Sequence, residues 1–254
     1  MSPQFEGQPL HPAVEIERLL ALIQAACGLD RNQAKTIVYY AAATHGLEHL
    51  NVFPALFLQG APATGKSTII DILEQIAYRP ERADGSLSKA ELRDSLNNNP
   101  TVLIEEADYV KEWQIRNRYS RNSSKTSVKR ARPDGWESEA LDIFGATVLH
   151  RRMPFKDPAV QSRAITVRTR KAKGDFSKDL VTIGLMHDRL IALVADIDWE
   201  LVAELGGNRI QDSWAPLLLV AQHIGDGDWL GWAAAQMEES TATLDAGQEE
   251  EPPQ

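Results

Sequence analysis

The sequence predicts an α/β fold built on a parallel sheet, with a helical segment before the sheet and helices after it. Three observations support this prediction. Short apolar runs of strand length alternate with stretches in which apolar residues recur at helical spacing. Such alternation is typical of parallel sheets, because parallel neighbours need a crossover connection. From residue 179 onward, the apolar spacing is helical only.

The N-terminal part of the chain is expected to contain a tail and two helices. Residues 1–11 carry acid and proline, lack the basic and apolar regions of a signal peptide, and are expected to be flexible. Apolar side chains recur at helical spacing over residues 13–26. Asp30 can cap a second helix that runs to about Thr44, and Gly46 would end it.

Four apolar runs predict the buried strands of the sheet, at residues 53–58, 101–104, 143–149 and 164–169. A helix over 64–78 follows the first strand and stops at Pro80. Another helix over 88–96 begins at Ser88, and Glu91 completes a capping box with it. Helices with clear start and stop signals in the sequence are therefore expected to connect the strands of the sheet.

The last third of the chain predicts three helices, at about 179–204, 209–224 and 228–238, separated by glycine pairs. The final residues are acidic, contain two prolines and are expected to be disordered. We therefore divide the chain into an N-terminal tail and helical segment, an α/β core with an insertion at 111–140, a C-terminal helical subdomain and an acidic disordered tail, at residues 1–50, 51–173, 174–239 and 240–254.

Composition excludes several classes of protein. No run of about 18 apolar residues occurs, so no membrane span is expected. The single cysteine, Cys27, excludes an intrachain disulfide and a cysteine-based metal site, and its helical context predicts a buried structural thiol. These features favour a reducing, cytoplasmic setting.

The motif that carries most chemistry lies directly after the first strand. It is Gly60-Ala61-Pro62-Ala63-Thr64-Gly65-Lys66-Ser67, followed by Thr68. Glycines let the backbone N–H groups turn toward phosphates, and the helix that starts there adds its positive end. Lys66 is expected to reach the β- and γ-phosphates of ATP, and Ser67 to ligate Mg²⁺. The alternatives are a chance glycine-rich turn and a loop that binds phosphate without hydrolysis.

A pair of acids ends the second strand. Glu105 is expected to hold the Mg²⁺ shell, although it is one methylene longer than the usual aspartate. Glu106 is expected to be the catalytic base, because a positioned carboxylate can accept a proton from the attacking water. Asp108 is more simply interpreted as a helix cap. The alternative for the pair is a solvated acidic strand end.

With these motifs the chain resembles the AAA+ and related oligomeric ATPases. More narrowly, it is similar to the ATPase modules attached to primase–helicase-like proteins of phages, plasmids and other mobile elements. The resemblance covers roughly residues 50–235, and the stretches that carry it are 59–68, 101–108, 145–169 and 212–229. It implies a P-loop NTPase core with an AAA+-like parallel sheet, followed by a C-terminal helical lid.

The resemblance also implies residues that complete the site. Arg163, before the last strand, is in the place of an arginine finger that one subunit supplies to its neighbour, which implies a homo-oligomeric ring or stack. The alternative is a surface arginine. A polar sensor is implied at the end of the third strand, where this chain departs from the family pattern and has His150. His150 either orients water or is an ordinary strand-end residue.

The insertion at 111–140 is basic although the whole chain has a net charge of −9. Residues 111–173 carry sixteen Lys and Arg against six Asp and Glu, so this part has a balance of +10 and the remainder −19. A helix is predicted over 109–121 and a hairpin around Asp134-Gly135. The candidate nucleic-acid contacts are Arg116, Arg118, Arg121, Lys125, Lys129, Arg130 and Arg132.

Cations that alternate with hydroxyls and amides suit a phosphodiester backbone. By the resemblance, a hairpin here would point into a central pore and track single-stranded DNA, with Trp136 as a stacking platform. Duplex DNA is the other candidate ligand. The alternatives are a solvated loop and an intersubunit contact surface.

Three functions follow from these features. The first is an ATP-driven motor that acts on nucleic acid, helicase-like or DNA-remodelling, in the replication of a phage or mobile element. The second is a nucleotide-dependent switch or loader that acts on a protein partner. A small-molecule kinase is the third, but no acceptor-site or lid signature supports it.

Overall fold

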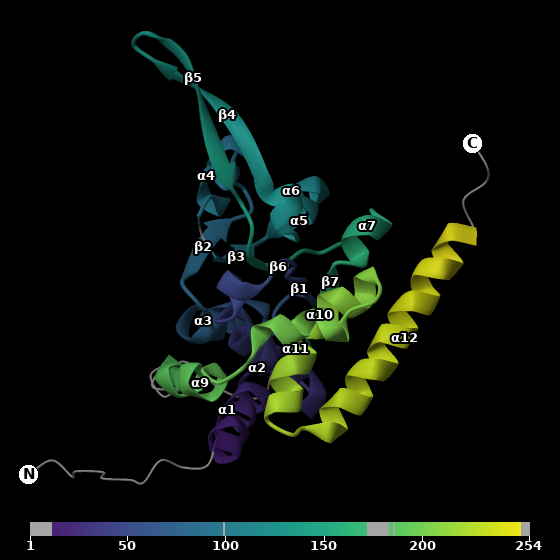
Figure 1. Cartoon of the computed structure of the whole chain (residues 1–254). Coiled ribbons are helices and arrows are strands. Elements are labelled where there is room, and N and C mark those ends of the chain that lie inside the picture. Colours follow the sequence, from purple (N-terminus) through teal and green to yellow (C-terminus); the bar gives the residue numbers. More distant parts are fainter. Residues whose placement is uncertain (1–11, 99, 172–182, 185, 250–254) are drawn as a thin grey trace, which may run out of the picture.

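A five-stranded parallel sheet forms the centre of the computed structural model, which describes residues 12–98, 100–171, 183–184 and 186–249 (Figure 1). The α-helices are α1 (Pro12–Cys27), α2 (Arg31–Thr44), α3 (Lys66–Ile76), α4 (Lys89–Leu96), α5 (Glu112–Arg118), α6 (Arg121–Ser124), α7 (Pro158–Gln161), α9 (His187–Val194), α10 (Val202–Leu205), α11 (Arg209–His223) and α12 (Gly227–Glu249). The strands are β1 (Ala55–Gln59), β2 (Pro80–Asp84), β3 (Thr101–Glu105), β4 (Lys125–Arg132), β5 (Gly135–Asp142), β6 (Ala146–His150) and β7 (Ala164–Arg168), and the short 3-10 turns are η1 (Leu47–His49), η2 (Ala107–Tyr109) and η3 (Trp199–Leu201).

The sheet has the strand order β2-β3-β6-β1-β7, and every neighbouring pair is parallel. The predicted parallel α/β sheet is therefore confirmed. β1 lies between β6 and β7, with Leu56 opposite Val148 on one side and opposite Ile165 on the other. Because the strands are parallel, the residues that follow β1, β3 and β6 all emerge at the same edge of the sheet, which we call the carboxyl edge.

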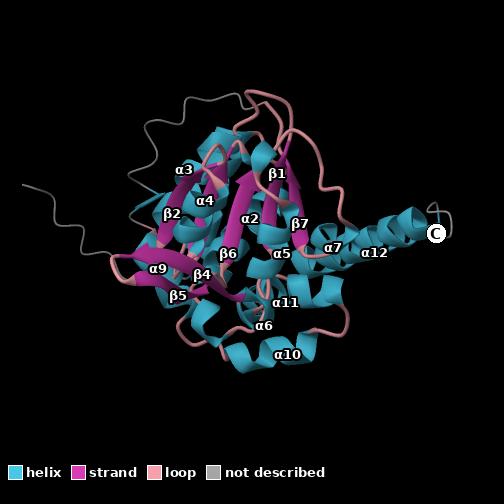
Figure 2. Cartoon of the chain, turned by 90° about the horizontal axis from the view of Figure 1, so that it is seen from above, coloured by secondary structure: helices cyan, strands magenta, loops and turns pink. Residues whose placement is uncertain are grey.

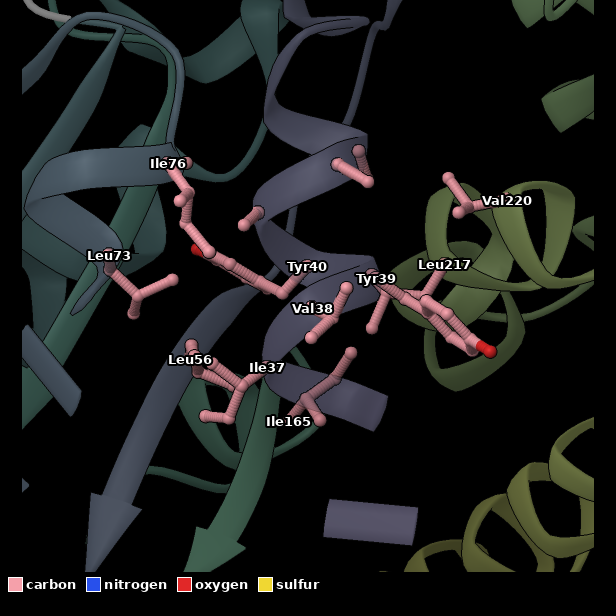
Figure 3. Packing of buried hydrophobic residues seen from close by; sticks show 14 of the residues in the cluster. Ile37, Val38, Tyr39, Tyr40, Leu56, Leu73, Ile76, Ile165, Leu217 and Val220 are labelled. Carbon is pink, nitrogen blue, oxygen red and sulfur yellow. The ribbon is translucent and has the colours of Figure 1, made fainter. Parts of the chain in front are cut away.

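Alternating side chains of the strands pack into two hydrophobic cores. Leu56 and Leu58 of β1 belong to the larger core with α1, α2, α3 and the C-terminal helices, whereas Ala55 and Phe57 belong to the smaller core beside α4 and the hairpin base. Figure 3 shows Leu56 and other sheet residues against side chains of α2 and α3. Complete burial of each such leucine contributes about 1.5–3 kcal/mol. This packing fixes β1 and α3, and therefore the loop between them.

The C-terminal helices are attached to the core through α2. The Lys35 ammonium lies 2.5 Å from an Asp226 oxygen, and the Tyr39 hydroxyl donates to the same carboxylate at 2.5 Å. The Trp229 ring lies edge-on to Tyr39, with centroids 4.9 Å apart. Burial opposes ionisation of Asp226, but the hydrogen bonds from Lys35 and Tyr39 outweigh it and lower its pKa. A charged junction of this kind holds the turn before α12 against the N-terminal helices.

Several predicted boundaries are wrong. The helix expected over 179–204 is interrupted after Val194, and its first residues lie outside the described chain. The tail that was expected to be disordered is helical as far as Glu249. It forms the second half of α12, which extends away from the sheet beyond β7 (Figure 2). In place of one helix over 109–121, the chain forms η2, α5 and α6. Within the described ranges, no helix has the length and apolar character that crossing a bilayer requires.

Candidate nucleotide-binding site

Residues 60–67 connect β1 to α3 at the carboxyl edge, and the start of this loop lies very close to the end of β7. A Cβ atom at Gly60 would lie 2.2 Å from the Thr169 hydroxyl and 2.8 Å from the Thr64 hydroxyl, so only glycine fits there. These two hydroxyls are 2.6 Å apart, and Thr169 also donates its backbone N–H to Gln59. Gly65 has a φ of 84°, which glycine adopts without strain, and α3 starts at the next residue.

The loop presents unused backbone donors. Among the described residues, none accepts a hydrogen bond from the backbone N–H groups of Ala61, Ala63, Thr64, Gly65 or Lys66. The Lys66 ammonium lies over the loop and donates to the carbonyls of Gly60 at 2.9 Å and Ala61 at 2.7 Å. Ser67, in the first turn of α3, is exposed. A curled loop of N–H groups with an ammonium above it at a helix start has the chemistry of an anion site.

The two predicted acids lie at the end of β3. Glu105 is its last residue, and the Arg82 guanidinium of β2 donates to its carboxylate at 2.8 Å. Glu106 is exposed and has a left-handed backbone, with a φ of 50°. Its carbonyl packs so closely on Gly85 that a Cβ there would lie 2.3 Å from the oxygen. A non-glycine residue rarely keeps this conformation unless its surroundings hold it.

His150 joins the elements of this edge. It ends β6, the strand between β1 and β3, and its Nε2 accepts the backbone N–H of Glu106 at 3.3 Å and lies 3.9 Å from a Glu105 oxygen. Burial, and then the charge of Lys66, lower the pKa of His150, while the neighbouring acids act in the opposite direction. The imidazole is therefore neutral at neutral pH and acts as an acceptor. The sequence alone left His150 undecided, whereas its contacts place it within the site.

Asp108 has a different role from the helix cap expected of it. It lies inside η2, and its carboxylate accepts the backbone N–H of Arg152 at 2.9 Å. This contact ties the segment after β6 to the segment after β3. The sequence does not point to Arg82 as a partner of Glu105 either. Its strand, β2, has a weak strand pattern, because Ala83 is its one buried side chain.

The donor set is compatible with Mg²⁺ only together with a phosphate. Ser67 and Glu105 supply the hard oxygen ligands that Mg²⁺ prefers. Among the described residues, no group of three or more His, Cys, Asp or Glu side chains could hold a metal ion by itself. Mg²⁺ commonly keeps water and substrate phosphate as ligands and needs few protein ligands. The residues present therefore fit a metal that arrives with a nucleotide.

Arg163 lies at the other end of the strands, where they begin, and not at the carboxyl edge. It directly precedes β7, whose first residue pairs with the first residue of β1, whereas the 60–67 loop follows the last residue of β1. Five strand residues rise about 16 Å along the sheet. Arg163 therefore does not belong to the same group of side chains as Lys66, Glu105 and Glu106 within one copy of the chain.

Two of the predicted nucleic-acid contacts are structural. Arg118 is 1 % exposed and donates to the carbonyls of Leu96, Pro100, Ile143 and Ala146. Arg121 donates to the carbonyls of Leu47 and Leu50 and lies over the Phe144 ring. The prediction that Arg118 contacts nucleic acid is wrong, because its guanidinium is buried, and the donors of the partly exposed Arg121 are already used by backbone carbonyls.

The predicted hairpin is confirmed and is longer than expected. β4 and β5 form an antiparallel arm that projects away from the sheet (Figure 1). Arg130 pairs with Asp94 at 3.1 Å and with Glu139, and Arg132 pairs with Glu137 at 3.1 Å.

The three remaining predicted contacts are Arg116, Lys125 and Lys129, and the first of them is paired with an acid. Arg116, on α5, lies 3.4 Å from Asp157. Lys125 and Lys129 are exposed and form no ion pair with a described residue, and Trp136 near the tip is 74 % exposed. The arm therefore offers two lysines and a tryptophan to an external partner.

Comparisons with known proteins leave the family open. No protein-family model and no curated protein sequence matches the chain. Among solved structures, one that matches is described as the A form apo structure of the NrS-1 C-terminal region. It is 12 % identical with a TM-score of 0.47, and the match covers 91 % of this chain and 72 % of that chain. At this level of similarity, function has to be argued from the residues themselves.

Proposed function

We propose that the protein is an ATP-binding and ATP-hydrolysing P-loop ATPase of the AAA+-like type, which works as a homo-oligomer on nucleic acid. One observation carries this proposal: the 60–67 loop with its unused N–H groups, the acid pair and His150 meet at one edge of the sheet. The strand order supports it. The chain leaves β1 for β2 at one side of the sheet and later passes from β6 to β7 at the other side of β1. Ligands of open α/β sheets bind where connections diverge in this way.

The residues would divide the work as follows. The loop N–H groups and Lys66 would bind the phosphates, and Lys66 would leave its carbonyl partners for the phosphate oxygens. Ser67 and Glu105 would hold Mg²⁺, which neutralises phosphate charge when it is bound. Glu106 would accept the proton of the attacking water. His150 and Gly85 would keep Glu106 in its left-handed conformation.

The direct test is the ATPase rate with and without single-stranded DNA, combined with the mass of the protein in solution with ATP. Hydrolysis that DNA stimulates in an oligomeric species supports the proposal. A monomer without a DNA response contradicts the motor function, and absence of hydrolysis in every condition contradicts the ATPase.

Glu106→Gln is expected to stop hydrolysis and to leave ATP binding intact. The amide keeps the size of the side chain but cannot accept a proton, so kcat should fall by about 10²–10⁴. The measurement is single-turnover hydrolysis together with ATP binding by calorimetry. Glu81→Gln makes the same change at an exposed acid of β2 that forms no ion pair with a described residue, so it is the matched control and should hydrolyse ATP at the wild-type rate. Normal turnover by Glu106→Gln would show that the base is another group.

The nucleic-acid part of the proposal now depends on fewer residues. Lys125 and Lys129, with Trp136 for stacking, are the cations of the arm that remain for a phosphodiester backbone. A double change of both lysines to Ala should weaken binding of single-stranded DNA and reduce the slope of log K against log salt by about 1.4. Ser138→Ala, opposite Lys129 in the register, is the uncharged control. An unchanged slope would show that these two lysines of the arm do not contact the DNA backbone.

A second function, a nucleotide-dependent switch or loader that acts on a protein partner, also has an observation in its favour. The two strands of the arm and their turn carry four basic and four acidic side chains, so the arm has no net charge. An exposed tryptophan on a charge-balanced arm is typical of a protein contact. Slow hydrolysis that DNA does not change, together with a loss of partner binding in Trp136→Ala, would favour this function.

A further inference from the structure

Two arginines, Arg163 and Arg209, lie near the end of the sheet where the strands begin, opposite the 60–67 loop. We call this end the arginine edge. Arg163 is partly buried there, donates to the carbonyl of Ala159 and lies over the Tyr119 ring, 5.3 Å from its centroid. These contacts fix the direction of its guanidinium without neutralising it. An arginine that is held in place and forms no ion pair with a described residue is well suited to receive an anion from outside.

Arg209 lies beside it, although the two are 46 positions apart in the sequence. It is the first residue of α11, is exposed, and forms no ion pair with any of the described residues. The Ser213 hydroxyl of α11 contacts both the carbonyl of Arg209, at 2.8 Å, and the carbonyl of Ser162, the residue before Arg163, at 3.1 Å, so the two arginines start from neighbouring stretches of backbone. Burial lowers the pKa of Arg163 most, and the charge of Arg209 is the next cause. Arg116 acts on Arg163 in the same direction.

Two of the nearby acids, Asp157 and Asp212, are already engaged by other groups, whereas Asp245 of α12 is exposed at the same hollow as Arg209. Asp157 caps α7 by accepting the backbone N–H of Ala159 at 2.8 Å and lies 3.4 Å from Arg116. Asp212 accepts the backbone N–H of Gly207 at 3.2 Å. Beside Arg209 there is an open hollow of about 510 Å³, which Ala159 also lines. Arg209 therefore borders a space that can admit part of another molecule, and Arg163 is joined to the rim of that space through its hydrogen bond to Ala159.

Within one copy, this pair cannot reach the nucleotide. Arg163 precedes β7 at the edge where β1 begins, and the 60–67 loop follows β1, about 16 Å further along the strands. We propose that Arg209 acts with Arg163 as a second arginine that one copy of the chain contributes to the phosphates bound by the next copy. This inference rests on the proposed ATPase function.

Two guanidinium groups suit this task because charge develops on the γ-phosphate oxygens during hydrolysis. Arg163, held by Ala159 and Tyr119, would keep a fixed direction, whereas the exposed Arg209 would adjust to the incoming phosphate. A contact between the carboxyl edge of one copy and the arginine edge of the next is heterologous, so it builds a ring or an open stack.

The first test changes Arg209 to Ala in the full chain. kcat for ATP should fall at least about tenfold, while ATP binding stays unchanged because each copy keeps its own 60–67 loop. Arg209→Lys should give an intermediate kcat, since lysine keeps the charge without the planar fork. Arg31→Ala, which removes an exposed arginine on α2, is the control and should keep the wild-type rate.

The second test mixes two proteins with impaired hydrolysis, Arg209→Ala and Lys66→Ala. In a mixed assembly, a Lys66→Ala copy offers an intact arginine edge to the intact loop of an Arg209→Ala copy, at up to about a quarter of the interfaces. Activity in the mixture above the sum of the two separate proteins supports the inference. Normal hydrolysis by Arg209→Ala, or no recovery on mixing, overturns it while the ATPase stands. An inactive wild-type protein would instead contradict the proposed function.

Discussion

Changing Lys66 to Ala is expected to abolish ATP turnover and to weaken ATP binding. The ammonium lies over the 60–67 loop, in contact with the carbonyls of Gly60 and Ala61, where the phosphates would be bound. Charge-assisted contacts contribute about 1.5–3 kcal/mol each, so losing two of them lowers kcat/KM by about 10²–10⁴.

The fold should tolerate this change. Lys66 is only partly buried and its partners lie at the surface, so the free energy of unfolding should change by less than about 1 kcal/mol. Steady-state ATPase assays and nucleotide titration measure the first effect, and urea unfolding measures the second. Lys156→Ala removes another exposed lysine and should behave like the wild type. Undiminished ATP binding by Lys66→Ala would mean that the loop does not bind phosphate.

Changing Arg118 to Met is expected to lower the free energy of unfolding by about 3–5 kcal/mol. The guanidinium is completely buried, and burial lowers its pKa to about 9, so it remains charged at neutral pH. Its donors satisfy carbonyls that end α4, precede β3, begin β6 and follow β5. Methionine fills most of the volume but offers none of these donors, although the carbonyl of Pro100 still accepts the backbone N–H of Ala146 at 2.7 Å.

The fold around Arg118 is adapted to it. A Cβ at Gly145 would lie 2.8 Å from the guanidinium and 2.3 Å from the carbonyl of Pro100, and the φ of 151° also favours glycine. Urea unfolding should show a lower midpoint for Arg118→Met and a smaller loss for Arg118→Lys, because lysine retains a charge with fewer donors. Arg116→Met, on the same helix but exposed, should change stability by less than about 0.5 kcal/mol. Equal midpoints for Arg118→Met and Arg116→Met would contradict this role.

The sequence predicts best those elements whose cause is local. β1, β3 and β7 are short apolar runs, and Ser88 caps α4 with the predicted capping box. β2 escaped prediction because it is an edge strand that starts with proline and buries only Ala83. The length of α12 was missed as well, since most of its second half is exposed and its sequence lacks an apolar stripe.

The site shows the same division. The 60–67 loop and the acid pair could be found from motif and context, since each directly follows a strand. Strand order cannot be obtained from the sequence, so neither the position of His150 between β1 and β3 nor the distance of Arg163 from the loop was predictable. Arg118 looked like its basic neighbours, and only the packing around it distinguishes a buried cation from a solvated one.

The turn between α1 and α2 gives the molecule a built-in chemical reporter. Cys27 is the one cysteine of the chain, is fully buried, and lies so close to Gly65 that a Cβ there would be 3.4 Å from the Cys27 Cα. Burial raises the pKa of its thiol to about 12, so the native protein reacts with thiol reagents only when this turn opens. The alkylation rate of unmodified protein therefore measures, without any engineered label, how often the contact between this turn and Gly65 opens as nucleotide is added.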